Sequence, residues 1–336
     1  MLRAARITKL LFAGTIISLI MMLLTPLGAF APHLIKKFRV PKTEASQDIG
    51  MYTCMDVGQP KERHRPQLSD TDHCILYEQP ATTDYIELFM HVLVGLPNAG
   101  RCNQDNGCQP PHSPYVDELR NFGDDWPPYG FTMVGMERLK NFQAAIQEVN
   151  RKNIKGAICE FGVWRGGGMM LAAAINERSA IRRDLYLFDA FSAFGGYGLN
   201  DRYLAVPLKD VKKNFRMLNL DPEQDNVHFV EGMFNETTAS WVERSDPIAV
   251  LRVDGNFYES YQSVMYAVYE NVPVGGIVIF DDVMSHQAVM RCWNDFKADH
   301  GLIEELVRID THSAWFRKKK NVKVDHSKKR DVPIPI

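Results

Sequence analysis

The chain has 336 residues, enough for one large domain or two modest ones with a full hydrophobic core. Its formal net charge of −2 excludes the strongly basic surface that nucleic-acid-binding proteins carry, so no nucleic-acid partner is expected. Hydrophobic residues make up 45% and charged residues 24%, which are ordinary values for a globular protein.

The N-terminal segment predicts a membrane anchor. Residues 10–31 are uncharged and mostly apolar, and a stretch of this length crosses a bilayer. Basic residues precede it: Arg3, Arg6 and Lys9. The positive-inside rule then places residues 1–9 in the cytosol, which predicts a single-pass type II membrane protein of the Golgi or another secretory compartment. The alternative is a cleaved signal peptide and a secreted product, because residues 29–31 resemble a cleavage site, although Pro32 disfavours cleavage there.

Residues 32–115 predict a luminal stem, because they are rich in polar residues and proline and lack sustained periodicity. A secretory compartment permits disulfides, and the stem holds cysteines that allow three pairings into two bridges: Cys54, Cys74, Cys102 and Cys108. Cys159 and Cys292 lie in apolar patterns and are expected to be buried thiols. The stretch 83–96 is apolar enough for a helix that packs on the main body. Residues 235–237 (Asn-Glu-Thr) form a glycosylation sequon if they are luminal and exposed.

The region 116–318 predicts a doubly wound, Rossmann-like α/β sheet that is mostly parallel, because apolar runs alternate with helical patterns. It opens with an amphipathic helix over 132–149. Short runs rich in Val and Ile are expected as buried parallel strands: 157–161, 185–188, 227–230, 248–253 and 277–280. Residues 302–310 and 313–317 predict an antiparallel closing pair. The basic tail 319–336 is expected to be disordered.

Acidic residues follow two of the predicted strands. Asp254 ends one apolar run, Asp281 and Asp282 end the next, and residues 258–271 between them have the composition of a crossover helix. Such a unit brings both strand ends to one edge of the sheet, where ligands bind. Carboxylates gathered there repel each other unless a cation or protons neutralise them, and an all-oxygen set suits Mg²⁺. The alternative is that the aspartates cap helices or face water. On the metal interpretation, Asp281→Ala removes activity and leaves the fold intact.

The first predicted strand leads into a glycine-rich turn that predicts a cofactor site. An acid precedes the glycines in the pattern E-x-G-x-x-x-G-x-G: Glu160, Gly162, Gly166 and Gly168. The pattern resembles the first motif of S-adenosylmethionine methyltransferases, and an acid before the turn suits a ligand with an ammonium group. Asp189, after the second strand, is placed to bind ribose hydroxyls, and Glu231, after the third, to wall the adenine. The alternatives are a generic glycine-rich turn and an ordinary helix N-cap.

The stretch from about residue 129 to 317 resembles the macrocin O-methyltransferase (TylF-like) family. The matching words follow in the family's order: TMVGMERL, CEFGVWRGGGMM, LYLFDAF, VHFVEGMFNETT, LRVDGNFYES, VGGIVIFDDV and AWFRK. This family uses S-adenosylmethionine and Mg²⁺ to methylate sugar hydroxyls of macrolide and aminocoumarin antibiotics. The resemblance therefore implies a methyltransferase fold and an S-adenosylmethionine- and Mg²⁺-dependent O-methyltransferase.

The resemblance also assigns the site residues. It implies that the metal ligands are Asp254, Asp281 and Asp282. It implies that Glu160, the glycine turn and Asp189 hold the cofactor, and that Met133, in the helix before the first strand, lines the cofactor pocket.

One position departs from the family pattern. The family motif is D-G-D-x-Y-E-S, and its second Asp is a proposed general base, whereas this chain has Asn256. An amide does not accept a proton at neutral pH. Three interpretations stay open: the metal alone acidifies the hydroxyl, another group such as His286 accepts the proton, or the chain is a weak or silent enzyme. The alternative for His286 is a solvent-facing loop residue.

The leading hypothesis is therefore an O-methyltransferase that acts on a sugar or glycan with vicinal hydroxyls in the secretory pathway. Its alternatives are a methyltransferase of a small polyketide or phenolic hydroxyl, and a catalytically silent cofactor-binding module. A homodimer is compatible with the sequence. Residues 83–130 are a candidate lid over the acceptor, whereas Trp164 and Trp315 are expected in the core and not as substrate platforms.

Overall fold

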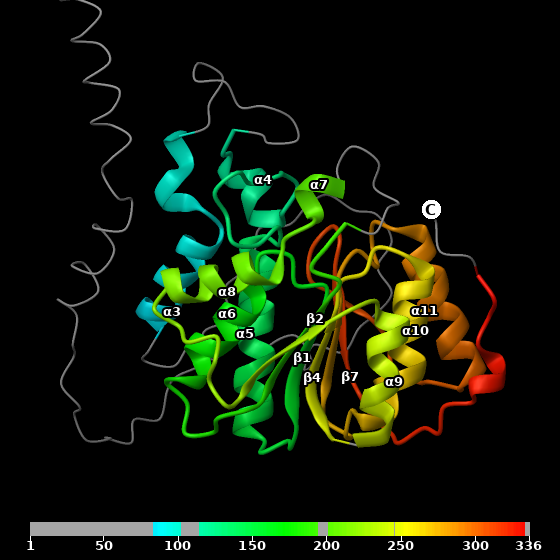
Figure 1. The fold of residues 1–336 in the computed structure, drawn as a ribbon. Helices are drawn as coiled ribbons and strands as arrows, with labels where there is room; N and C mark the ends of the chain where they lie inside the picture. Colours follow the sequence, from blue (N-terminus) through cyan, green and yellow to red (C-terminus); the bar gives the residue numbers. More distant parts are fainter. Residues whose placement is uncertain (1–82, 102–113, 194–200, 245, 333–336) are drawn as a thin grey trace, which may run out of the picture. The chain divides into compact units, whose positions relative to one another are not determined.

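The computed structural model describes residues 83–101, 114–193, 201–244 and 246–332. Their centre is a seven-stranded sheet in the order β3-β2-β1-β4-β5-β7-β6 (Figure 1). The strands are β1 (Ala157–Phe161), β2 (Leu185–Asp189), β3 (Val227–Glu231), β4 (Ile248–Val253), β5 (Ile277–Phe280), β6 (Val307–Arg308) and β7 (Ala314–Arg317). β1 to β5 run parallel and the last two strands antiparallel, as predicted, although β6 is much shorter than the run that predicts it.

Helices cover both faces of this sheet, which is why β1, β4 and β5 are buried along their whole length. One face carries α5 (Met136–Arg151), α6 (Gly167–Asn176) and α8 (Leu208–Met217), and the other carries α9 (Phe234–Arg244), α10 (Tyr258–Val268) and α11 (Gln287–Asp299). Alternate residues of a strand serve the two faces: Ile158 packs in the first core and Cys159 in the second. The crossover helix predicted between β4 and β5 is α10, followed by the 3₁₀ turn η3 (Tyr269–Asn271).

Shorter elements surround this frame. They are α3 (Thr83–Leu93), η1 (Leu96–Arg101), α4 (Asp117–Phe122), α7 (Asp201–Leu204) and η4 (His326–Lys328). α3 lies within the predicted stem, but Phe89, Met90 and Leu93 are part of the same core as α5 and α6. The helix expected over 83–96 is therefore confirmed, and it belongs to the domain itself.

The expectation of a disordered tail after β7 is wrong for residues 319–332, which pack on α10 and α11. The side chain of Val324 is buried, and its amide donates to the Glu270 carboxylate at 2.8 Å. The amide of Arg330 donates to Gln262 at 2.7 Å, and its guanidinium pairs with Asp299. Acidic partners on two helices thus neutralise a segment whose own composition is basic.

Several predictions fall outside the described residues. These are the membrane anchor, most of the stem and the proposed disulfides, including Cys54, Cys74, Cys102 and Cys108. Within the described ranges, no helix has both the length and the apolar character needed to cross a membrane. Cys159 and Cys292 are both buried, as predicted.

Candidate active site

The carboxyl ends of β4 and β5 bring three aspartates together. Asp254 follows β4, and Asp281 and Asp282 follow β5, and one carboxylate oxygen of each lies within 4.8 Å of the others. The amide of Asp281 donates to the carbonyl of Val253 at 2.9 Å, which holds the two strand ends side by side. None of the three caps a following helix, because the N-cap residues of α10 and α11 are Phe257 and His286. The juxtaposition expected from the sequence is therefore present.

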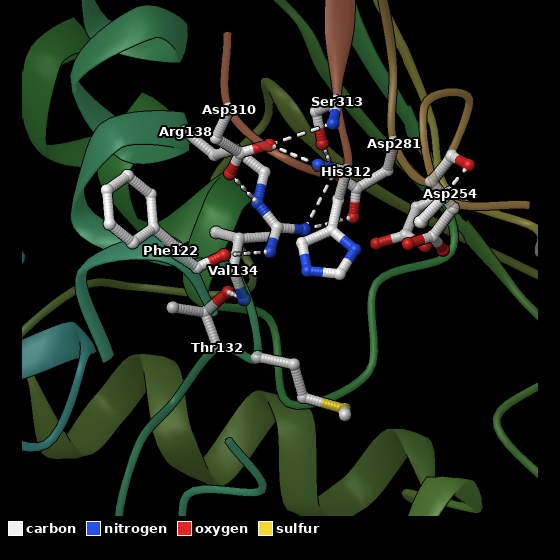
Figure 2. A network of polar contacts seen from close by, with 12 residues as sticks. Phe122, Thr132, Val134, Arg138, Asp254, Asp281, Asp310, His312 and Ser313 are labelled. Carbon is white, nitrogen blue, oxygen red and sulfur yellow. Dashed lines mark hydrogen bonds and ion pairs between the residues drawn. The ribbon is translucent and has the colours of Figure 1, made fainter. Parts of the chain in front are cut away.

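Asp281 is the most heavily bonded of the three (Figure 2). Arg138 Nη1 donates to both of its carboxylate oxygens at 2.9 Å, Arg252 Nη2 lies 3.1 Å from Oδ2, and the Ser313 hydroxyl donates to Oδ1. Burial alone would raise the pKa of Asp281, but the two arginines outweigh burial and hold the pKa well below its usual range. Asp281 is therefore an anion whose charge the protein itself compensates.

Asp254 and Asp282 are compensated less completely. Burial and the charge of Asp281 raise the pKa of Asp254 well above its usual range and the pKa of Asp282 to about 6. In the cluster as a whole, carboxylates outnumber the arginines that contact them, and every converging ligand atom is oxygen. A hard divalent cation fits this donor set and would relieve the repulsion between the carboxylates.

A cavity of about 160 Å³ adjoins the aspartates. The residues expected at the cofactor or acceptor that line it are Met133, Glu160, Gly162, Gly168, Asp189, Asp254 and Asn256. Others expected in the site do not line it: Gly166, Glu231, Asp281, Asp282 and His286. Asp281 and Asp282 lie next to Asp254, which does line the cavity.

The cavity wall also contains residues that the sequence analysis missed: Thr132, Ser192, Leu204, Arg252 and Ser263. Glu231, predicted to wall the adenine, is exposed at the end of β3, and the next two residues line the cavity in its place. Successive residues at the end of a strand face opposite sides of the sheet. The motif alone therefore does not show which of these residues faces the cavity. Asn235 of the sequon also lines the cavity, a position where a glycan would obstruct it.

At two positions of the turn, another group lies so close to the backbone that only glycine fits. Gly162 has φ of +91°, and a Cβ there would clash with the carbonyl oxygen of Asp254. A Cβ on Gly168 would clash with Oε1 of Glu160. Gly166 is needed for its backbone conformation, because it is the N-cap of α6 and has φ of +94°. The glycine pattern therefore shapes the cavity floor, although only two of its three predicted glycines line it.

Glu160 is the buried acid of the cavity. Its Oε1 accepts a hydrogen bond from Arg252 Nη1 at 2.7 Å, whereas no group among the described residues donates to its Oε2. Burial raises the pKa of Glu160 to about 7, against the opposing effect of Arg252. A buried carboxylate oxygen without a donor is costly, so this atom fits a ligand that supplies one. An ammonium group is such a ligand.

Asp189 joins two strand ends. Its Oδ2 accepts from the amides of Val163 at 2.7 Å and Trp164 at 3.1 Å, and its Oδ1 accepts from the amide of Phe191 at 2.9 Å. These bonds hold the glycine turn after β1 against the end of β2. Asp189 thus shapes the turn and also presents its carboxylate to the cavity.

The candidate proton acceptors lie in different places. Asn256 lines the cavity and adopts φ of +59°, a conformation in which Asn and Asp are among the most frequent non-glycine residues. His286 does not line the cavity; its side chain is 48% exposed, and its Nδ1 lies 3.8 Å from Asp282 Oδ1. The sequence analysis missed His312, which contacts Asp124 and lies beside Asp281 (Figure 2). No local signal identifies that pair, since 188 residues separate its members.

The segment before α5 borders this edge of the sheet. Arg138 Nη2 donates to the carbonyl of Phe122 at 2.6 Å, and Arg165 Nη1 donates to the carbonyl of Gly130 at 2.7 Å. Trp164 is only partly buried and lines the cavity, so the expectation that it is a core residue is wrong. Trp315 is buried, as expected.

Comparison with known proteins gives a consistent assignment. Residues 101–318 match the family described as Macrocin-O-methyltransferase (TylF). The chain is 32% identical over 249 residues to demethyldecarbamoylnovobiocin O-methyltransferase of Streptomyces niveus, covering 70% of this chain and 93% of that protein. It is 31% identical over 222 residues to mycinamicin III 3''-O-methyltransferase of Micromonospora griseorubida, covering 61% and 85%. The solved structure of the O-methyltransferase NovP superposes with a TM-score of 0.63 at 29% identity, covering 71% of this chain and all of that one.

These relatives correct the predicted location. A type II membrane protein of the Golgi or the secretory lumen, with secretion as the alternative, is wrong, because the relatives are enzymes of bacteria, which have no Golgi.

The sequence match covers most of the chain, and the solved relative has the same fold over its whole length. The resemblance stated from the sequence words is therefore confirmed. The chain belongs to the macrocin O-methyltransferase (TylF) family and is an S-adenosylmethionine-dependent O-methyltransferase.

Proposed function

We propose that this enzyme methylates a hydroxyl of a sugar attached to a small-molecule acceptor, and that it uses Mg²⁺ to do so. The observation that carries the proposal is the buried, undonated Oε2 of Glu160 in the same cavity as Asp254 of the three-aspartate cluster. One subsite suits an ammonium group and the other suits a hard cation. A third relative, 30% identical over 212 residues, is the 8-demethyl-8-(2,3-dimethoxy-alpha-L-rhamnosyl)-tetracenomycin-C 4'-O-methyltransferase of Streptomyces olivaceus, and its rhamnosyl substrate supports a sugar acceptor here.

Each subsite has a defined task. Glu160 accepts a hydrogen bond from the donor's ammonium group, and Asp189 fixes the turn and offers its carboxylate to the ribose. Asp254, Asp281 and Asp282 are the residues that hold Mg²⁺. Mg²⁺ held by these residues would supply a Lewis acid for an acceptor with vicinal hydroxyls. The cavity walls exclude water and hold the reacting groups close together, which a direct displacement requires.

Binding and transfer measurements test this function. We expect isothermal titration of the full chain to show saturable binding of S-adenosylmethionine. We expect methyl transfer to glycosylated macrolides or aminocoumarins in the presence of Mg²⁺, and its loss with excess EDTA. Absence of donor binding with and without Mg²⁺ would contradict the proposal, and transfer only to aglycone phenols would identify the rival acceptor class.

Asn256→Asp tests how the proton leaves the acceptor hydroxyl. A carboxylate at this position supplies the base that the family pattern has, and Asp tolerates the positive φ, so we expect kcat to rise at least about tenfold. The measurement is the initial rate with saturating donor and Mg²⁺. The matched comparison is His286→Ala, which lowers kcat strongly only if His286 is the base.

The same pair of variants tests the catalytic competence of the wild type. A wild type that binds the donor but is inactive, and that gains activity on Asn256→Asp, would contradict the proposed reaction. An active wild type whose rate is unchanged in both variants would indicate that neither position supplies the base.

A further inference from the structure

Arg252 lies inside the carboxylate cluster, on the central strand β4. It stands in register with Glu160 of β1, two residues before Asp254, and its side chain is 6% exposed. Its Nη1 donates to Glu160 Oε1 at 2.7 Å, while its Nη2 lies 3.1 Å from Asp254 Oδ2 and 3.1 Å from Asp281 Oδ2. One guanidinium therefore contacts a carboxylate from the end of each of three neighbouring strands.

These contacts engage carboxylates that a cation would also use. Arg252 engages two of the three aspartates whose oxygens converge, and it cannot give up its charge, since a guanidinium stays protonated. Two effects oppose each other. The guanidinium orders the carboxylates, which favours cation binding, but it also repels the cation and competes for lone pairs.

The magnitudes decide between these effects. Ordering two short aspartate side chains changes an affinity by only a few-fold. Repulsion between a divalent cation and a charge about 5 Å away, at an effective dielectric constant of about 20, corresponds to far more than a tenfold change before screening. Competition therefore outweighs ordering.

We propose that Arg252 is a positioning residue that acts as the internal counter-ion of the carboxylate cluster and keeps the affinity for free Mg²⁺ low; this inference rests on the proposed function. Without a cation, the guanidinium balances Glu160, Asp254 and Asp281, which otherwise repel one another in a buried site. A weak intrinsic affinity makes firm cation binding depend on the oxygens of the acceptor.

The test is the affinity of the full chain for Mg²⁺ alone, measured by isothermal titration without donor or acceptor. Arg252→Gln removes the charge, and we expect it to bind Mg²⁺ at least tenfold more tightly, which corresponds to about 1.4 kcal/mol. Arg252→Lys keeps the charge, and we expect its affinity to stay within about threefold of the wild type. If Arg252 only held the site together, Arg252→Gln would bind Mg²⁺ more weakly than the wild type, because its carboxylates would be less ordered.

Arg183→Gln is the matched control. Arg183 and Arg252 are each 5% exposed as residues, but Arg183 bonds to Asn150 and to the carbonyls of Gly156 and Ile154, away from the cavity. We expect this variant to lose stability without a change in Mg²⁺ affinity.

Instability of Arg252→Gln does not block the test. Urea unfolding at a series of Mg²⁺ concentrations yields the same dissociation constant, because a ligand that binds the folded state stabilises it in proportion to its saturation. A Gln variant that binds Mg²⁺ no more tightly than the wild type, or a Lys variant that matches a tightened Gln variant, would overturn the proposal. A wild type and an Arg252→Gln variant that both bind donor but no Mg²⁺ would overturn the cation site, and this inference with it.

Discussion

Asp281→Ala is expected to lower the free energy of unfolding by about 3–5 kcal/mol and to abolish methyl transfer. Asp281 is the shared partner of Arg138 and Arg252, and both guanidiniums stay buried when it is removed. Removing one carboxylate from a buried ion-pair cluster costs several kcal/mol, but Arg138 keeps Asp310 and Arg252 keeps Glu160 and Asp254, so we expect the fold to persist at lower stability. Urea unfolding followed by circular dichroism measures the loss.

Asp282→Asn is the control for this prediction. Asp282 has φ of +56°, which Asn adopts readily, and no arginine lies within ion-pair distance of it in the described part of the chain. We expect a change in unfolding free energy below about 1 kcal/mol together with a comparable loss of activity. Equal destabilisation by both variants would contradict the distinction drawn between the two neighbouring aspartates.

Glu160→Gln is expected to weaken binding of S-adenosylhomocysteine, which keeps the donor's ammonium group, by about 100-fold. The substitution removes the charge that faces the ligand, and it directs an amide N–H either at the ligand's ammonium group or at Arg252. Isothermal titration of the folded variant measures the effect. The same variant also separates the two subsites, since the three aspartates that converge for the cation are untouched.

Glu231→Gln is the matched control, because Glu231 also ends a strand but is exposed and does not line the cavity. We expect its affinity for S-adenosylhomocysteine to equal that of the wild type. Gly168→Ala is a second probe, since its Cβ would clash with Oε1 of Glu160 while the charge stays the same. A Glu160→Gln variant with wild-type affinity would show that the ammonium group binds elsewhere.

Most of the parallel sheet followed from the sequence because each strand is a contiguous apolar run. The acids at the strand ends were equally visible, since parallel topology carries Asp254, Asp281 and Asp282 to one edge. The glycine pattern identified the turn but not the role of each glycine. Gly166 caps a helix, whereas Gly168 makes room for Glu160.

Two of the wrong predictions, the disordered tail and the core position of Trp164, share a physical cause, which is that they were read from composition alone. The tail looked disordered because it is basic, but Asp299 and Glu270 on neighbouring elements neutralise it. Trp164 looked like a core residue because it is large and apolar, yet the turn places it at the cavity. Partners distant in sequence decide such cases.

The sequence by itself determined the fold class, the family and the acids of the candidate site. Each of these was identified from short contiguous segments, namely apolar runs and motifs. Only the tertiary structure decided which arginine side chains contact those acids. Arg138 and Asp281 are 143 residues apart, and Glu160 and Arg252 are 92 apart. Strand order and register bring them into contact, and a local pattern contains neither, so the charge balance that governs the site emerges only when the sheet is assembled.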